Sequence, residues 1–181
     1  MKNIIRSIIL FILLISVLIY IIHIDSTNGA LTRLTVHKQE LNHETIPESF
    51  DGLSFVYLSD IHAYTLDETY YEKVMNQIIE LKPDFIFFGG DLLDEENLND
   101  DQVLQMIDWL SSLPAPLGKF AVLSDLDQDH IETIKAIYSQ SNIETLENAV
   151  INLHNKSKDS IQLIGLSTHG SNDVLNQIEL G

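Results

Sequence analysis

The sequence predicts an α/β domain whose mostly parallel β-sheet is flanked by helices and preceded by one apolar helix. Two observations support this fold class. Short apolar runs alternate three times with segments in which apolar residues recur at helical spacing, a pattern typical of parallel sheets with right-handed crossovers. Ahead of them, the stretch from Ser7 to Ile24 contains no Asp, Glu, Lys or Arg.

This apolar stretch has the length of a transmembrane helix. At about 1.5 Å per residue it reaches roughly 27 Å, close to the thickness of a bilayer's hydrocarbon core. Lys2 and Arg6 precede it, so the positive-inside rule predicts a single pass through the cell membrane, a cytoplasmic N-terminus and an extracytoplasmic domain. The lipid bilayer is then a partner of residues 7–24. We expect three parts: an anchor over 1–25, a polar linker over 26–31 and a domain over 32–181.

A cleaved signal peptide is the alternative for this segment. Signal peptides have an apolar stretch of roughly 7–15 residues and small residues before the cleavage site. Here the stretch is longer, and the candidate site after Ala30 has Asn28 where a small residue is expected. Both differences favour an uncleaved anchor.

The charge balance of the remaining chain excludes several functions. Of 27 acidic and 10 basic residues, Asp25, Lys2 and Arg6 lie in the first 25 positions. Residues 26–181 therefore carry 26 acidic and 8 basic residues, a formal charge of −18. This charge excludes nucleic-acid binding through a broad basic surface and argues against electrostatic docking on anionic lipid. The absence of cysteine excludes disulfides, thiolate zinc sites and cysteine nucleophiles.

The strands are predicted from short apolar runs between turn residues. An alternating segment over 31–37, LTRLTVH, suggests a first short strand. Three compact apolar runs predict buried strands, and two later runs predict further strands. In chain order these are 53–58, 85–88, 120–123, 150–153 and 161–164.

Three helices are predicted between these runs from apolar residues spaced three and four apart. The first follows a capping-box pattern from Thr65 to Glu68, and the second follows Asn99 or Asp100 as its cap. Pro83 and Pro114 lie where these two helices should end. The buried faces expected for the three helices are Tyr71, Val74, Met75 and Ile78; Val103, Met106, Ile107 and Leu110; and Ile131, Ile134, Ile137 and Tyr138.

Each of the three buried strands leads into an acidic segment. Asp60 and His62 follow the first, Asp91 follows Gly89-Gly90 after the second, and Asp125 follows the third. In parallel sheets the carboxyl ends of the strands share one edge, where ligands bind. Carboxylates crowded at such an edge repel one another unless a cation offsets their charge.

Taken singly, these residues have simpler explanations. An isolated Asp60 would be a strand-end turn or cap, an isolated His62 a packed loop histidine, and Asp91 a turn residue. Their equivalent positions on successive strands favour a metal site instead. Oxygen and imidazole ligands without sulfur suit Mn, Fe, Zn or Mg better than copper.

The segments LSDIH (58–62) and GDLLD (90–94) resemble the D-x-H and G-D-x-x-D motifs of calcineurin-like metallophosphoesterases, and the apolar N-terminus is similar to their membrane-anchored bacterial branch. The resemblance covers about residues 32–170. It implies two divalent metal ions, a phosphoester substrate and a two-sheet sandwich flanked by helices, of which this sequence carries the N-terminal portion. By this resemblance Asp60 and His62 bind the first metal, Asp91 bridges both, and Asp94 supports its loop.

The third motif departs from that family. Where the family has G-N-H-D or G-N-H-E, this chain has Ser124-Asp125-Leu126-Asp127. Asp125 replaces the asparagine that binds the second metal, and a carboxylate can still act as a ligand. Leu126 replaces the histidine that assists the leaving group, so no catalytic residue is assigned. Loss of a general acid commonly lowers the rate by about 10²–10⁴.

The remaining histidines and acidic residues are assigned no site. His130, His154 and His169 lack the family's later G-H-x-H pattern and are expected to be surface or loop residues. The acidic stretch 94–101 is expected to be a solvated loop and helix start.

Two functions therefore remain open. The first is a membrane-anchored, metal-dependent phosphoesterase. The second is a catalytically inactive, truncated relative that binds one ion or none and acts as a binding module or as a non-functional fragment.

Overall fold

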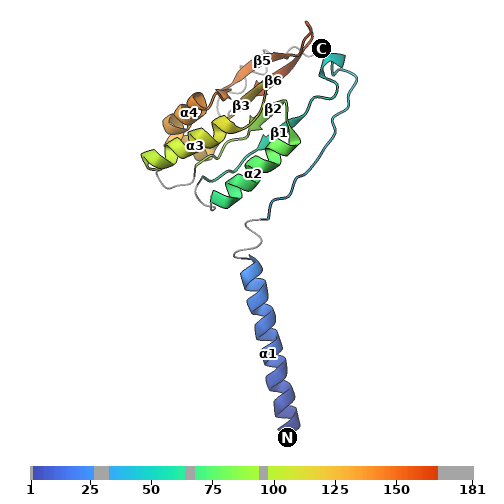
Figure 1. Ribbon diagram of the computed structural model, residues 1–181, viewed down its shortest axis with the longest axis vertical. Coiled ribbons are helices and arrows are strands. Elements are labelled where there is room, and N and C mark those ends of the chain that lie inside the picture. Colours follow the sequence, from blue (N-terminus) through green and yellow to red (C-terminus); the bar gives the residue numbers. More distant parts are fainter. Residues whose placement is uncertain (1, 27–32, 64–67, 94–97, 167–181) are drawn as a thin grey trace. The chain divides into compact units, whose positions relative to one another are not determined.

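The computed structural model describes residues 2–26, 33–63, 68–93 and 98–166 (Figure 1). The chain divides into two compact units, Met1–Lys38 and Gln39–Gly181. The first unit contains α1 (Lys2–Ile24), none of whose residues is buried. By length and composition α1 could cross a membrane, as the sequence predicts.

The second unit is an α/β fold built on a four-stranded parallel sheet, which confirms the predicted fold class. The sheet order is β1-β2-β3-β4, and Phe55 pairs with Phe85, which pairs with Gly118. A separate antiparallel pair, β5 and β6, follows in the chain. The strands are β1 (Phe55–Leu58), β2 (Phe85–Phe88), β3 (Gly118–Ala121), β4 (Glu144–Thr145), β5 (Ala149–His154) and β6 (Ser160–Gly165).

Three helices alternate with the first four strands and pack on one face of the sheet (Figure 1). Two 3₁₀ helices, η2 and η3, complete the described elements. Asn99 caps α3 as predicted, in a capping box with Gln102. The helical elements are α2 (Glu68–Leu81), α3 (Asp100–Ser112), α4 (Ile131–Gln140), η2 (Glu48–Phe50) and η3 (Asp125–His130).

Alternation along β2 separates two apolar clusters. Ile86 and Phe88 face the helices, in a core that contains Ile78, Leu110 and Ile137. Phe85 and Phe120 on the opposite face pack with Leu146 and with apolar residues of β5 and β6. The β5–β6 hairpin therefore covers part of the second sheet face.

The β1 portion of that second face is uncovered within the described residues. Phe55 and Tyr57 of β1 are 50% and 62% exposed, although the Phe55 ring lies 5.3 Å from the ring of Phe87. This side of the sheet thus presents aromatic side chains to solvent.

Two of the predicted strands differ from the structure. Residues 33–43, which include most of the alternating 31–37 segment, form no strand, because alternation without a neighbouring strand provides no hydrogen-bond partners. The third strand begins at Gly118, two residues before the predicted start at Phe120. The other four predicted strands match the structure within one to two residues, whereas no strand was predicted at the position of β4. The predicted cap at Thr65 lies outside the described residues.

Lys119 joins β3 to the C-terminal end of α3. Its buried Nζ donates hydrogen bonds to the carbonyl oxygens of Leu110 (2.7 Å) and Ser111 (3.4 Å), which have no partner inside the helix. Burial lowers the pKa of the Lys119 amine, because desolvation disfavours its charged form.

We expect Tyr138 to make the fold less stable at alkaline pH. Its side chain is 1% exposed, and burial, together with the negative charge of Asp127, raises the pKa of the phenol. Above pH ~10 the unfolded chain loses this proton while the folded chain retains it, so the free energy of unfolding should fall as pH rises.

Chemical denaturation of wild type and Tyr138→Phe between pH 8 and ~11 measures this effect. The stability of wild type relative to the variant should decline by up to about 1.4 kcal/mol per pH unit above pH ~10. Titration of Lys119 changes the free energy of unfolding in the opposite direction, but this effect is the same in wild type and in the variant. A constant difference over this range would contradict the prediction.

Candidate metal centre

The loops after β1 and β2 are held together by backbone hydrogen bonds that continue beyond both strands. The amide of Asp60 donates to Gly90 O (3.2 Å), that of Ile61 to Asp91 O (2.9 Å) and that of Ala63 to Leu92 O (2.9 Å). The D-x-H segment and residues 90–93 of the G-D-x-x-D segment therefore run side by side at the carboxyl edge of the sheet.

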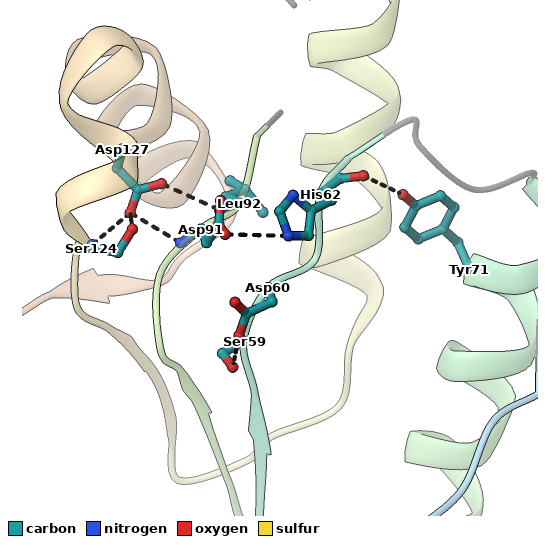
Figure 2. Close-up of polar contacts among 8 residues, drawn as sticks. All are labelled: Ser59, Asp60, His62, Tyr71, Asp91, Leu92, Ser124 and Asp127. Atoms are coloured by element: carbon teal, nitrogen blue, oxygen red, sulfur yellow. Dashed lines mark hydrogen bonds and ion pairs between the residues drawn. The ribbon is translucent and has the colours of Figure 1, made fainter. Parts of the chain in front are cut away.

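This pairing brings three of the predicted ligands together (Figure 2). One potential ligand atom from each of Asp60, His62 and Asp91 lies within 4.8 Å of the other two. His62 Nε2 lies 3.3 Å from Asp91 Oδ2. Asp91 is buried, His62 is half-buried and Asp60 is exposed, so the group lies at the surface with one side embedded in the sheet edge.

All three of these residues have left-handed backbone conformations. Their φ angles are 53° for Asp60, 45° for His62 and 56° for Asp91. For residues other than glycine this conformation is disfavoured by roughly 1–3 kcal/mol, although Asp and His tolerate it better than most. Such strain at adjacent positions is typical of functional sites, where surrounding contacts hold residues in place.

Neighbouring polar contacts orient the first loop. Ser59 Oγ donates a short hydrogen bond to Asp60 Oδ2. Tyr71 Oη donates to the carbonyl oxygen of His62 (3.2 Å), and Trp109 Nε1 donates to the carbonyl oxygen of Tyr71 (3.2 Å). Through these bonds, α2 and α3 support the loop that carries His62.

The three side chains fit a divalent cation. They offer two carboxylates and one imidazole, whose combined charge can offset that of a dication. Three protein ligands at an accessible edge, with room for solvent, are typical of catalytic metal sites, whereas structural zinc sites are closed by four. The donor types agree with the predicted Mn, Fe, Zn or Mg.

The third strand end does not complete this group. Asp125 begins η3 and is not among the residues that converge, so its role as a ligand stays a prediction. Leu126, at the position of the expected general acid, is 70% exposed. The chain turns into η3 directly after Ser124, which directs this segment differently from the two paired loops.

The remaining predicted residues do not belong to the group of Asp60, His62 and Asp91, or they lie outside the described residues. Asp94 and His169 lie outside the described residues. His130 ends η3, and the exposed His154 contacts the carbonyl oxygen of Asp159 through its Nδ1 (3.1 Å). Neither His130 nor His154 belongs to a metal-binding group in the part of the chain that the structure describes.

Sequence reasoning missed the structural importance of Asp127. It was assigned no role, yet this carboxylate is 1% exposed and contacts the backbone of the second loop (Figure 2). An acidic residue at the third position after a helix cap is a signal that could have indicated its bonds to Ser124.

The chain is similar to curated metallophosphoesterases. It is 35% identical over 85 residues to the metallophosphoesterase YkuE of Bacillus subtilis, with 45% of this chain and 29% of the relative covered. It is 34% identical over 86 residues to the UDP-2,3-diacylglucosamine pyrophosphatase LpxG of Chlamydia trachomatis, with 45% and 26% covered. A transmembrane protein with a metallophosphoesterase domain from Danio rerio is 33% identical over 81 residues, with 44% and 16% covered.

These similarities support the resemblance seen in the motifs, and with it the use of divalent metal. Less than a third of each relative's length is spanned by the chain. No family model matches the sequence.

Gly90 should be the most sensitive glycine of this site. Its φ is +92°, and an added Cβ would lie 2.7 Å from the backbone nitrogen of Ser124. Gly52 is a matched control, because its φ is +75° and an added Cβ would meet nothing within 4 Å. We expect Gly90→Ala to lower the free energy of unfolding by at least about 1 kcal/mol more than Gly52→Ala does.

Chemical denaturation of the two alanine variants and wild type tests this difference. Equal losses of stability in the two variants would show that left-handed strain alone accounts for both effects, and that the close contact between Gly90 and Ser124 is not required.

Proposed function

We propose that this chain is the metal-binding portion of a membrane-anchored phosphoesterase, in which Asp60, His62 and Asp91 bind a divalent cation. The observation that carries this proposal is the convergence of these three side chains within 4.8 Å at the carboxyl edge of the sheet. Similarity to proteins named as metallophosphoesterases supports the same chemistry.

The three residues have distinct parts in this proposal. Asp91, buried between the two loops, provides the central carboxylate, and His62 Nε2 lies 3.3 Å from it. Asp60 provides an exposed carboxylate that Ser59 orients. The cation would polarise a phosphoryl oxygen and lower the pKa of a water molecule. Asp125 remains our proposed ligand for a second cation.

The nature of residue 126 suggests a substrate class. Leucine cannot donate a proton, so departure of a strongly basic alkoxide would be unassisted. We therefore propose phosphoesters or phosphoanhydrides with weakly basic leaving groups. One relative is named as a pyrophosphatase of UDP-2,3-diacylglucosamine, and a pyrophosphate bond releases a phosphate group of this weakly basic kind.

For the membrane arrangement, we propose that α1 anchors the chain in a single pass. The anchor comprises residues 1–25, the linker 26–31 and the domain 32–181, with Lys2 and Arg6 on the cytoplasmic side. The domain would then act outside the cytoplasm. The helix length and the named transmembrane relative support membrane attachment.

We expect manganese-dependent hydrolysis of bis(p-nitrophenyl) phosphate by the full chain in detergent. Asp91→Asn should lower this rate by about two orders of magnitude or more, because a central ligand loses its charge. Glu72→Gln, which removes a charge from the exposed side of α2, should leave the rate unchanged.

A folded, manganese-loaded wild type without hydrolysis would contradict the enzymatic proposal. That result would favour the non-catalytic relative, for which the replacement of a proton donor by the exposed Leu126 is the supporting observation.

We expect Leu126→His to assist poor leaving groups selectively. A histidine there can protonate the departing oxygen. The rate of hydrolysis of an alkyl or phenyl phosphoester should therefore rise by up to about 10²–10⁴-fold, and the rate for the p-nitrophenyl phosphoester far less. The dependence of log kcat on leaving-group pKa should become shallower than in wild type. Equal slopes of log kcat against leaving-group pKa in wild type and Leu126→His would contradict the proposed role of residue 126.

A further inference from the structure

Asp127 is the most deeply buried carboxylate among the described residues. The residue as a whole is 1% exposed, compared with 5% for Asp91. It makes no ion pair with a described lysine, arginine or histidine. Burying a charged group is unfavourable unless hydrogen bonds replace its hydration, so its donors define what it does.

Four hydrogen bonds from two loops meet at this carboxylate (Figure 2). Oδ2 accepts from the Ser124 amide (2.7 Å), from Ser124 Oγ (3.0 Å) and from the Asp91 amide (3.1 Å). Oδ1 accepts from the Leu92 amide (3.3 Å). Asp127 thus links the start of η3 to the backbone of the residue that carries the central ligand.

We propose that Asp127 is a positioning residue that holds the Asp91 backbone in its left-handed conformation and thereby sets the metal affinity of the site. Asp91 has a φ of 56°, which is disfavoured without supporting contacts. Two successive amides, those of Asp91 and Leu92, donate to the two oxygens of one carboxylate. Rotation of the Asp91 peptide would break both bonds.

The close contact at Gly90 fits this role. An added Cβ on Gly90 would lie 2.8 Å from Ser124 Cβ and 3.1 Å from Asp127 Oδ2. The second loop therefore passes directly over the carboxylate, at a distance that only glycine allows. The close contact at Gly90 therefore fixes the position of the second loop and, with it, the position of Asp91.

A carboxylate suits this position better than an amide. Two oxygens without hydrogens can accept all four bonds, whereas asparagine would present an NH₂ group to one set of backbone donors. Charge-assisted bonds of this kind are also stronger than neutral ones. Asp127→Asn therefore removes the linkage while nearly preserving the volume of the side chain.

The expected effect on metal affinity rests on the proposed function. The expected effect on the backbone hydrogen bonds of Asp91 and Leu92 does not. In metal-free protein, hydrogen exchange of the Asp91 and Leu92 amides reports the linkage directly, with the amides of β2 as an internal reference. In the same full-length chain in detergent, manganese affinity is measured from free Mn²⁺ by electron paramagnetic resonance.

We expect Asp127→Asn to accelerate exchange at Asp91 and Leu92 by at least about 10-fold relative to β2. Manganese affinity should fall about 10-fold or more, as for other groups that orient metal ligands. Leu110→Ala is the destabilised control: it opens a cavity beneath α3 and should accelerate exchange in β2 and the loop alike, without a selective loss of manganese affinity.

Unchanged protection of Asp91 and Leu92 in Asp127→Asn, or equal effects of the two variants, would overturn the proposal. If Asp127→Asn does not fold, Ser124→Ala replaces it. This variant removes one of the four bonds, so about threefold faster exchange at Asp91 and about threefold weaker manganese binding are expected, and no change would overturn the proposal. If wild type binds no manganese, the proposed function fails, and the exchange measurements alone decide the role of Asp127.

Discussion

The parallel pairing of β1 with β2, continued past the ends of both strands, is the constraint on which the candidate site depends. Backbone bonds from Asp60, Ile61 and Ala63 to the second loop keep the two acidic segments in register. A change of register by one residue would turn the side chains of Asp60 and His62 away from that of Asp91. The pairing of the two strands therefore determines whether the side chains of the candidate site can meet at all.

Much of this arrangement could be predicted because it follows from local patterns. Apolar runs predict β2 and the separate strands β5 and β6, helical spacing predicts α2, α3 and α4, and Asn99 is confirmed as the cap of α3. Asp60, His62 and Asp91 could be placed together because the carboxyl ends of parallel strands share an edge. These inferences need only periodicity and topology.

The rest depends on contacts between distant segments. The segment 31–37 alternates like a strand, but its described residues 33–37 form none, since pairing requires a neighbour that the pattern itself does not specify. The start of β3 at Gly118 is set by pairing with Phe85 rather than by its own apolar run. Asp127 lies 36 positions from Asp91, so its bonds to the second loop could not be deduced from sequence spacing.

The uncovered aromatic face of β1 has a consequence for how the protein behaves once detergent covers the apolar α1. Within the described residues β1 is the terminal strand of its sheet, and it exposes Phe55 and Tyr57. Such surfaces attract one another, while the net charge of −17 keeps molecules apart. Added salt weakens that repulsion but not the apolar attraction. Colloidal stability should therefore decrease with ionic strength, and low-salt buffers are the natural choice for handling this protein.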